Sequence, residues 1–143
     1  MSANAIADKV ARAMLAAEGA GPAWGMEIEE AREGYARVRM AVTGAMLNGH
    51  GTVHGGMIFA LADSAFAYAC NSRNLRSVAA QASIVYLEPA REGDVLIAEA
   101  QERALVGRSG VTHVAVRTDS GRAIAEFTGF SRSVGGAIIG ESE

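Results

Sequence analysis

The chain has 143 residues, half of them apolar, and a formal net charge of −3. This length fits one domain, and the apolar content can form a full core without disulfides or metals. The acidic balance argues against nucleic-acid binding, which requires a basic surface. Cys70 is the only cysteine, so no disulfide can form within the chain, and its apolar neighbours favour a buried thiol.

The first nineteen residues are predicted to form an amphipathic helix that ends near Gly19. Charged side chains are mixed into its apolar residues, so the segment does not resemble a signal peptide. The longest apolar run, Met57–Cys70, is too short to span a bilayer and contains Asp63. We therefore expect a cytoplasmic protein with no membrane partner.

The rest of the chain predicts strands on both sides of one long helix. The GAGP sequence, Gly19–Pro22, is expected to break the chain. Alternating residues then predict a hairpin, with strands Trp24–Glu30 and Tyr35–Val42 around a turn at Glu33-Gly34. A glycine-rich loop, Thr43–His54, leads into a helix from Gly55 to about Ser72, which is apolar nearly all round and should be buried.

Four further strands are predicted after this helix: Val78–Leu87, Asp94–Ala104, Gly110–Thr118 and Ala123–Val134. Their connections have hairpin length, so the sheet should be mostly antiparallel. A helix without a polar face fits a sheet that wraps around it. The predicted class is α+β, with an antiparallel sheet around a long central helix and an extra N-terminal helix.

The start of the central helix offers backbone donors that no side chain covers. The first four N–H groups of a helix lack partners within it and lie at the positive end of its dipole. At Gly55 and Gly56 a ligand oxygen could approach these groups closely, as in an oxyanion hole. The alternative is that the glycines only permit a tight turn, and the sequence leaves both interpretations open.

Asp63 places a carboxylate in the middle of this apolar helix. An unpaired buried carboxylate is costly, and burial disfavours its ionised form. That environment suits a general base, or a nucleophile that attacks a carbonyl carbon. The structural alternative is an ion pair with Arg73 or Arg76, although both lie beyond the apolar part of the helix.

Gly55 and Asp63 are eight residues apart, which corresponds to about 12 Å along a straight helix. An oxyanion donor must lie about 3 Å from the developing charge, and a base must reach its proton. One helix can hardly place both groups around a single carbonyl. We therefore expect Asp63 of a second copy of the chain to complete each site of a two-fold dimer.

Other interpretations of the glycine-rich loop are weaker. His50 and His54 have the spacing of a helical metal-binding pair, but the surrounding glycines disfavour a helix, so no metal site is predicted. The loop lacks the Gly-Lys-Ser/Thr ending of a P-loop and the third glycine of a dinucleotide fingerprint. Ser64, His54 and Asp63 do not form a triad, because neighbouring helix residues face different directions.

The spaced motifs resemble the hotdog-fold acyl-CoA thioesterases of the phenylacetate-degradation (PaaI-type) subfamily. The matching residues are Asn48-Gly49-His50, His54-Gly55-Gly56, Asp63 and Asn71. The resemblance extends from about Trp24 to Gly140, and the closing segment Val134–Glu141 is also similar. It implies one hotdog domain over residues 1–143 that pairs into dimers or dimers of dimers (homotetramers).

The resemblance also implies a role for each matching residue. Asp63 would activate water or attack the thioester itself, and the backbone N–H of Gly55 would polarise the thioester carbonyl. Asn48 would orient the water or nucleophile, and His54 would line the site near the carbonyl. The implied substrates are CoA thioesters of small aryl acids, especially ring-hydroxylated phenylacetyl-CoA. No cofactor is implied, because CoA is part of the substrate.

Two positions depart from this family. Glu88 precedes Pro89 where many members have a basic residue, and Val85 stands where many have Asp. An acidic protein needs local arginines to hold the phosphates of CoA, and Arg108 and Arg132 are the candidates. The alternative for each arginine is a solvated surface position.

Two other functions are compatible with parts of the pattern. A hotdog dehydratase or hydratase would also pair a histidine with a carboxylate across two chains, but would not need the Asn48 loop in this form. A non-catalytic acyl-CoA-binding regulator would carry a DNA-binding segment, and the first nineteen residues are too few for one. We therefore predict an acyl-CoA thioesterase.

Overall fold

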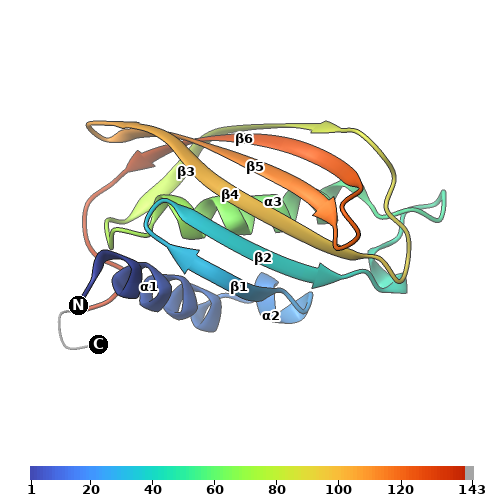
Figure 1. Cartoon of the computed structure of the whole chain (residues 1–143), viewed down its shortest axis with the longest axis horizontal. Coiled ribbons are helices and arrows are strands. Elements are labelled where there is room, and N and C mark those ends of the chain that lie inside the picture. The colour runs from blue at the N-terminus through green and yellow to red at the C-terminus, as the bar shows by residue number, and fades with distance from the viewer. Residues whose placement is uncertain (141–143) are drawn as a thin grey trace.

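The sheet is a single six-stranded antiparallel layer that covers one long helix, α3, in a computed structural model that describes residues 1–140 (Figure 1). In chain order the elements are α1 (Ala3–Ala17), α2 (Ala20–Ala23), β1 (Glu27–Arg32), β2 (Tyr35–Ala41), the short 3-10 helix η1 (Gly44–Met46), α3 (Gly55–Cys70), β3 (Ser77–Tyr86), β4 (Val95–Val106), β5 (Ser109–Thr118) and β6 (Ala123–Ser133). The strands lie in the order β1-β2-β4-β5-β6-β3, and every neighbouring pair is antiparallel. The predicted fold class is confirmed.

The core lies between α3 and the sheet, because α3 is apolar on nearly every side. Leu61, Ala62 and Ala65 are completely buried, and the Phe66 ring lies 5.7 Å from the Phe127 ring of β6. Gly129, also on β6, lies directly beneath Phe66. A Cβ at this position would be 2.7 Å from two carbons of the Phe66 ring, so the packing requires glycine here.

The N-terminal helix α1 packs beside α3 and against β1 (Figure 1). Ser2 caps its start, since the Ser2 hydroxyl accepts a hydrogen bond of 3.1 Å from the N–H of Ala5. Val10 and Ala11 on its inner side are completely buried. At its other end, the Glu18 carboxylate accepts a hydrogen bond from the hydroxyl of Tyr68 in α3.

One prediction for the segment between α1 and β1 was wrong. The first helix does end before Gly19–Pro22, as expected, and that segment also contributes to the short helix α2, but the strand expected from Trp24 begins at Glu27. The N–H of Trp24 bonds to the carbonyl of Ala20, and Gly25 adopts a left-handed φ of 68°. The alternation of Trp24 with Met26 imitates a strand, but these side chains reach the core from a turn.

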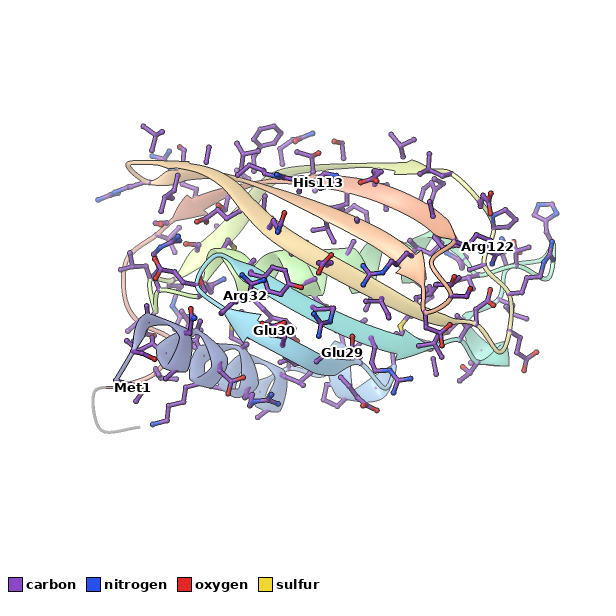
Figure 2. All side chains as sticks on the ribbon, in the orientation of Figure 1. Met1, Glu29, Glu30, Arg32, His113 and Arg122 are labelled. Carbon is purple, nitrogen blue, oxygen red and sulfur yellow. The ribbon has the colours of Figure 1, made fainter. Side chains whose placement is uncertain are left out.

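The outer face of the sheet, on the side away from α3, carries ion pairs between neighbouring strands (Figure 2). Arg37 of β2 contacts Glu29 of β1, and His113 of β5 contacts Glu126 of β6. Exposed pairs of this kind add little stability. They keep the outer face polar, whereas α3 covers the apolar face.

Strand β3 forms one edge of the sheet and pairs only with β6 among the described strands. Its side chains are all at least partly exposed, and Val78, Val85 and Tyr86 are between 49% and 61% exposed. A long apolar edge with unpaired backbone groups is a ready template for another strand.

Within residues 1–140, no helix has the length and apolar character needed to cross a membrane.

Candidate functional site

His54 caps the start of α3 through both its side chain and its backbone. Its backbone is extended (φ −60°, ψ 132°), and its Nδ1 accepts a hydrogen bond of 2.8 Å from the N–H of Gly56. Its carbonyl accepts bonds from the N–H groups of Met57 and Ile58, at 2.9 and 3.4 Å. Because Nδ1 is an acceptor, the proton of the neutral imidazole lies on Nε2, which stays available as a donor.

Gly55 has the one N–H in the first turn of α3 that finds no acceptor in the described chain. The N–H groups of Gly56, Met57 and Ile58 are all bonded to His54. The dipole of α3 makes this unpaired N–H a favourable place for a negatively charged oxygen. This geometry is compatible with an oxyanion donor at Gly55, and that role stays a prediction.

The alternative explanation for the glycines, a tight turn, is not supported by their conformation. Neither Gly55 nor Gly56 has a positive φ, so the backbone does not require glycine at either position. Neighbouring side chains leave little room for a Cβ at either position. A Cβ at Gly55 would lie 3.0 Å from the hydroxyl oxygen of Tyr86, and a Cβ at Gly56 would lie 3.0 Å from Nδ1 of His54.

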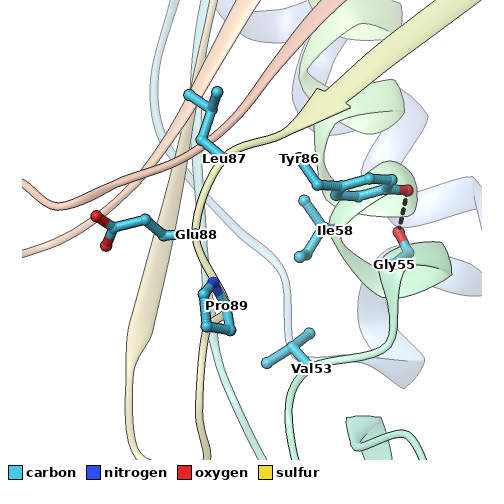
Figure 3. A pocket seen from close by; sticks show the side chains of 7 residues that line it. All are labelled: Val53, Gly55, Ile58, Tyr86, Leu87, Glu88 and Pro89. Carbon is cyan, nitrogen blue, oxygen red and sulfur yellow. Dashed lines mark hydrogen bonds between the residues drawn. The ribbon is translucent and has the colours of Figure 1, made fainter.

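A cavity of about 390 Å³ opens beside Gly55 (Figure 3). Its walls are mostly apolar: Val53, Gly55, Ile58, Tyr86, Leu87, Glu88 and Pro89. The Tyr86 hydroxyl donates a hydrogen bond of 2.9 Å to the carbonyl of Gly55. Figure 3 shows the carboxylate of Glu88 turned away from Gly55, so the part of the cavity nearest the free N–H is uncharged.

Sequence analysis missed Tyr86, although a signal for it was present. The predicted strand Val78–Leu87 alternates, and this alternation places Tyr86 on the same face as Ile84, which packs against the core. The face of β3 directed toward α3 therefore ends in an aromatic side chain at the helix start. This signal lies in a strand, 31 residues from Gly55, and outside the motifs of the loop and the helix.

Asp63 lies two turns further along α3 and is only partly exposed. Within the described chain its carboxylate makes no hydrogen bond or ion pair. Burial raises the pKa of Asp63 above its ordinary value. The suggested structural partners are engaged elsewhere, since Arg73 pairs with Glu33 and Glu102, and Arg76 donates to the carbonyl of Ala137.

The protomer brings His54 and Gly55 together but keeps Asp63 apart from them. Gly55 and Asp63 lie in one continuous helix, Gly55–Cys70. Eight helical residues therefore separate them by about 12 Å along the helix axis, as expected. The apolar cavity lies at the Gly55 end. Within one protomer, Asp63 therefore does not reach a carbonyl held by the N–H of Gly55.

Asn48 holds the loop that precedes His54. Its Oδ1 accepts hydrogen bonds from the N–H groups of His50 and Thr52, at 2.9 and 3.2 Å, and its Nδ2 donates to the Thr52 hydroxyl at 3.1 Å. This leaves one amide hydrogen of Nδ2 without a described acceptor. The implied role of Asn48 in orienting a nucleophile stays a prediction.

Residues 1–140 contain no group of three or more His, Cys, Asp or Glu that could hold a metal.

Arg108 and Arg132 lie side by side at the far end of the sheet. Arg108 is in the turn between β4 and β5, and Ser109 pairs in register with Arg132 of β6. Neither arginine makes a described ion pair. Arg132 also pairs with Val78 at the start of β3, whereas Tyr86 at the end of β3 contacts Gly55. Eight strand residues span about 26 Å, so the arginines are remote from Gly55 of the same protomer.

Residues 50–125 match the family model of the thioesterase superfamily, which is more than half of the chain. This segment contains His54, Gly55, the whole of α3 and most of the sheet. The chain belongs to the thioesterase superfamily.

Within this superfamily the chain is similar to the acyl-coenzyme A thioesterase PaaI of Escherichia coli, with 43% identity over 92% of this chain and 94% of that protein. The structure of the E. coli PaaI protein matches with a TM-score of 0.93, 41% identity and coverage of 95% of this chain and 99% of that one. A hypothetical thioesterase from Streptococcus pneumoniae, solved with coenzyme A, matches with a TM-score of 0.76, 29% identity and coverage of 78% and 90%. The predicted family, a hotdog-fold thioesterase of the PaaI type, is confirmed.

The candidate site residues lie at two separate places on α3. His54 and Gly55 stand at the start of the one helix that the sheet covers, next to an apolar cavity. Asp63 is on the same helix, about two turns further along, and does not line this cavity. Glu141, the last residue of the closing motif noted in the sequence, lies outside the described residues.

Proposed function

We propose that this thioesterase hydrolyses CoA thioesters of small aryl acids, such as phenylacetyl-CoA or its ring-hydroxylated forms. The observation that carries the proposal is the unpaired N–H of Gly55 at the mouth of an apolar cavity of about 390 Å³. The E. coli relative is an acyl-coenzyme A thioesterase, and the S. pneumoniae structure contains coenzyme A; both support CoA as the carrier. An apolar cavity with one polar feature suits an aryl acyl group.

The proposed reaction uses water and no cofactor. The N–H of Gly55 and the Nε2–H of His54 polarise the thioester carbonyl. Asp63 takes a proton from water while the water oxygen bonds to the carbonyl carbon. The carbon–sulfur bond then breaks, and the proton returns to the departing thiolate. Alternatively, the Asp63 carboxylate attacks the carbonyl carbon, and the carbon–sulfur bond breaks to release the CoA thiolate. Water then hydrolyses the resulting anhydride, which gives the free acid, restores Asp63 and supplies the proton that the thiolate takes. The raised pKa of Asp63 suits a base that must hold the proton briefly.

We infer that each site is shared by two protomers. The unpaired apolar edge of β3 supports a two-fold dimer in which two β3 strands pair antiparallel. Such pairing brings the Tyr86 end of one strand toward the Val78 end of the other. The Gly55 site of one protomer then faces Asp63 of the partner subunit across the interface. Two such dimers could associate further into a homotetramer.

The same two-fold dimer gives Arg108 and Arg132 a role in binding the phosphates of CoA. Both lie at the Val78 end of β3, and neither is neutralised by a described acidic side chain. In the two-fold dimer they would approach the partner's cavity and could hold phosphates of CoA. Glu88, beside this cavity, contacts Arg122 at 3.7 Å and would not bind phosphate.

A cytoplasmic location stays a prediction from the sequence.

Two substitutions at Gly55 test the oxyanion donor directly. Alanine and proline both add a Cβ against Tyr86, but only proline removes the N–H. Proline is favourable at the first residue of a helix, and the extended His54 suits the position before proline. We expect the kcat of Gly55→Pro to be at least about 100-fold below that of Gly55→Ala. Equal kcat values would contradict the oxyanion role.

A mixed dimer tests the shared site. One chain carries Asp63→Asn and the other Gly55→Pro, and different affinity tags allow the heterodimer to be purified. A shared site predicts that one of the two sites is intact, so activity recovers to roughly half of the wild-type value. A verified heterodimer without activity would show that both groups act within one chain.

A substrate panel separates thioester hydrolysis from the alternative hotdog chemistry. We expect phenylacetyl-CoA and hydroxyphenylacetyl-CoA to be hydrolysed faster than acetyl-CoA. Hydration of an enoyl-CoA, with every saturated thioester left intact, would instead identify a hydratase. Binding of acyl-CoA without turnover would identify a non-catalytic binding protein.

A further inference from the structure

Tyr86 links the end of the edge strand β3 to the first turn of α3. Its hydroxyl donates a hydrogen bond of 2.9 Å to the carbonyl of Gly55, a residue 31 positions earlier in the chain (Figure 3). The side chain is 49% exposed, so apolar burial alone does not explain its position. The ring lies over Gly55, the one residue in the first turn of α3 whose N–H has no described acceptor.

The Tyr86 ring is packed tightly against Gly55. A Cβ at Gly55 would lie 3.0 Å from the hydroxyl oxygen, 3.1 Å from Cζ and 3.4 Å from Cε1 of Tyr86. No other side chain lies as close to this position. The space above the Gly55 Cα is therefore defined by Tyr86.

Gly55 needs such a constraint, because glycine has the widest range of backbone conformations and the first residue of a helix is free to fray. The peptide group before Gly55 is fixed by the bonds from Met57 and Ile58 to the His54 carbonyl. The peptide group after it is fixed at its N–H by Nδ1 of His54 and at its carbonyl by the hydroxyl of Tyr86. The first of these peptide groups carries the N–H of Gly55, and the second anchors the Gly55 Cα on its other side, so together the contacts hold Gly55 in place at the start of α3.

We propose that Tyr86 is a positioning residue that, together with His54, holds the Gly55–Gly56 peptide and thereby keeps Gly55, with its free N–H, in place beside the substrate carbonyl. This inference rests on the proposed thioester hydrolysis. Donors that stabilise an oxyanion must lie close to where the charge develops, so a small change in the direction of this N–H lowers the rate. The hydroxyl itself does not contact the substrate in this arrangement.

Tyr86→Phe tests the proposal, because it removes the hydroxyl and keeps the cavity wall. We expect kcat to fall about three- to ten-fold with KM changed less than about two-fold, since the loss concerns the transition state. Tyr35→Phe is the matched control. Its hydroxyl bonds to Glu99, which lies away from the cavity, and its removal should leave kcat unchanged.

Two further measurements separate positioning from general stability. Hydrogen exchange of the Gly56 amide, followed by NMR, should quicken at least about three-fold in Tyr86→Phe, while that of Asn71 at the other end of α3 stays the same. In a Gly55→Pro background, where the N–H is absent, Tyr86→Phe should reduce kcat no further. Unchanged exchange of Gly56, or an equal loss of kcat in both backgrounds, would overturn the proposal.

The outcomes also distinguish this inference from the proposed function. If the wild-type protein hydrolyses no thioester, the proposed function is wrong, and the exchange of Gly56 decides whether Tyr86 holds the helix start. If the wild-type protein is active and Tyr86→Phe retains full kcat, the function stands and the positioning role is overturned.

Discussion

The hydroxyl of Tyr68 in α3 donates a hydrogen bond to the carboxylate of Glu18, the residue that ends α1. Tyr68 is 1% exposed, and burial, followed by the neighbouring carboxylate, raises the pKa of its hydroxyl. This contact joins the N-terminal helix to the helix that carries Gly55 and Asp63. The N-terminal helix is therefore attached to the central helix through a specific polar contact as well as apolar packing.

Tyr68→Phe should lower the free energy of unfolding by about 1–3 kcal/mol, because the Glu18 carboxylate loses its buried partner. Urea unfolding followed by circular dichroism measures this change. Glu18→Gln is the control, since its side-chain oxygen can still accept the Tyr68 hydrogen bond. This variant should lower the free energy of unfolding by less than Tyr68→Phe does. An equal loss in both variants would show that the charge of Glu18 matters more than the hydrogen bond.

Asp63→Asn should reduce kcat at least about 100-fold and leave KM nearly unchanged, because it removes a base or nucleophile that acts in the transition state. Steady-state hydrolysis of phenylacetyl-CoA measures both constants. Ser64→Ala, the next position along α3, is the control, since the Ser64 hydroxyl bonds only to the carbonyl of Ala60 among described groups. A folded Asp63→Asn protein with near-normal kcat would remove Asp63 from the mechanism.

The same Asp63→Asn variant should be more stable than the wild-type protein at neutral pH. Burial raises the pKa of Asp63 in the folded state, so the folded chain binds this proton more tightly than the unfolded chain does. Wild-type stability therefore falls as pH rises from the unfolded pKa, near 3.8, through the higher folded pKa. Asparagine does not titrate, so the variant should gain stability over that interval. Thermal unfolding at a series of pH values should show the two proteins converging below about pH 4.

His54→Ala should lower the free energy of unfolding by about 1 kcal/mol, because the N–H of Gly56 loses its side-chain acceptor. His54→Asn should retain most of this stability, since asparagine is a good residue at the start of a helix. Neither variant has the Nε2–H donor. If that donor polarises the thioester, kcat should fall in both, and full activity of His54→Asn would restrict His54 to capping.

Gly129→Ala should destabilise the fold by about 1–3 kcal/mol, because its methyl group would overlap the Phe66 ring. Phe66→Leu in the same chain leaves room for the methyl group, so the double variant should lose less stability than the sum of the two single variants. Gly49→Ala is the control for the cost of placing alanine at a glycine position, because nothing lies within 4 Å of the added Cβ. Like Gly129, Gly49 does not have a positive φ, so the control adds no backbone strain.

The sequence predicted the parts of the site that depend on local chain geometry. The exposed N–H of Gly55 follows from helix geometry, and the distance to Asp63 follows from residue spacing alone. The contacts that complete the site come from distant segments and leave no local pattern. Tyr86 reaches Gly55 through the pairing of β3 with β6, and the hydrogen bonds of Asn48 arise within an irregular loop.

At Trp24 a sequence pattern is present but predicts the wrong structure. Its alternation with Met26 and Ile28 is a good strand pattern, but one left-handed glycine, Gly25, is enough to turn the chain. Alternation records which side chains reach the core and does not record the path of the backbone between them. The lack of a partner for Asp63 was equally invisible, because it depends on where Arg73 and Arg76 find other acceptors.

The buried position of Cys70 has a practical consequence for measuring this enzyme. Burial, then the charges of Glu102 and Asp63, raises the pKa of the Cys70 thiol to about 12. Thiol reagents react with the thiolate, of which only a fraction on the order of one in ten thousand would be present at pH 8. A chromogenic thiol reagent should therefore report CoA release continuously with almost no signal from the protein. Reaction of Cys70 itself would then signal that the end of α3 has opened.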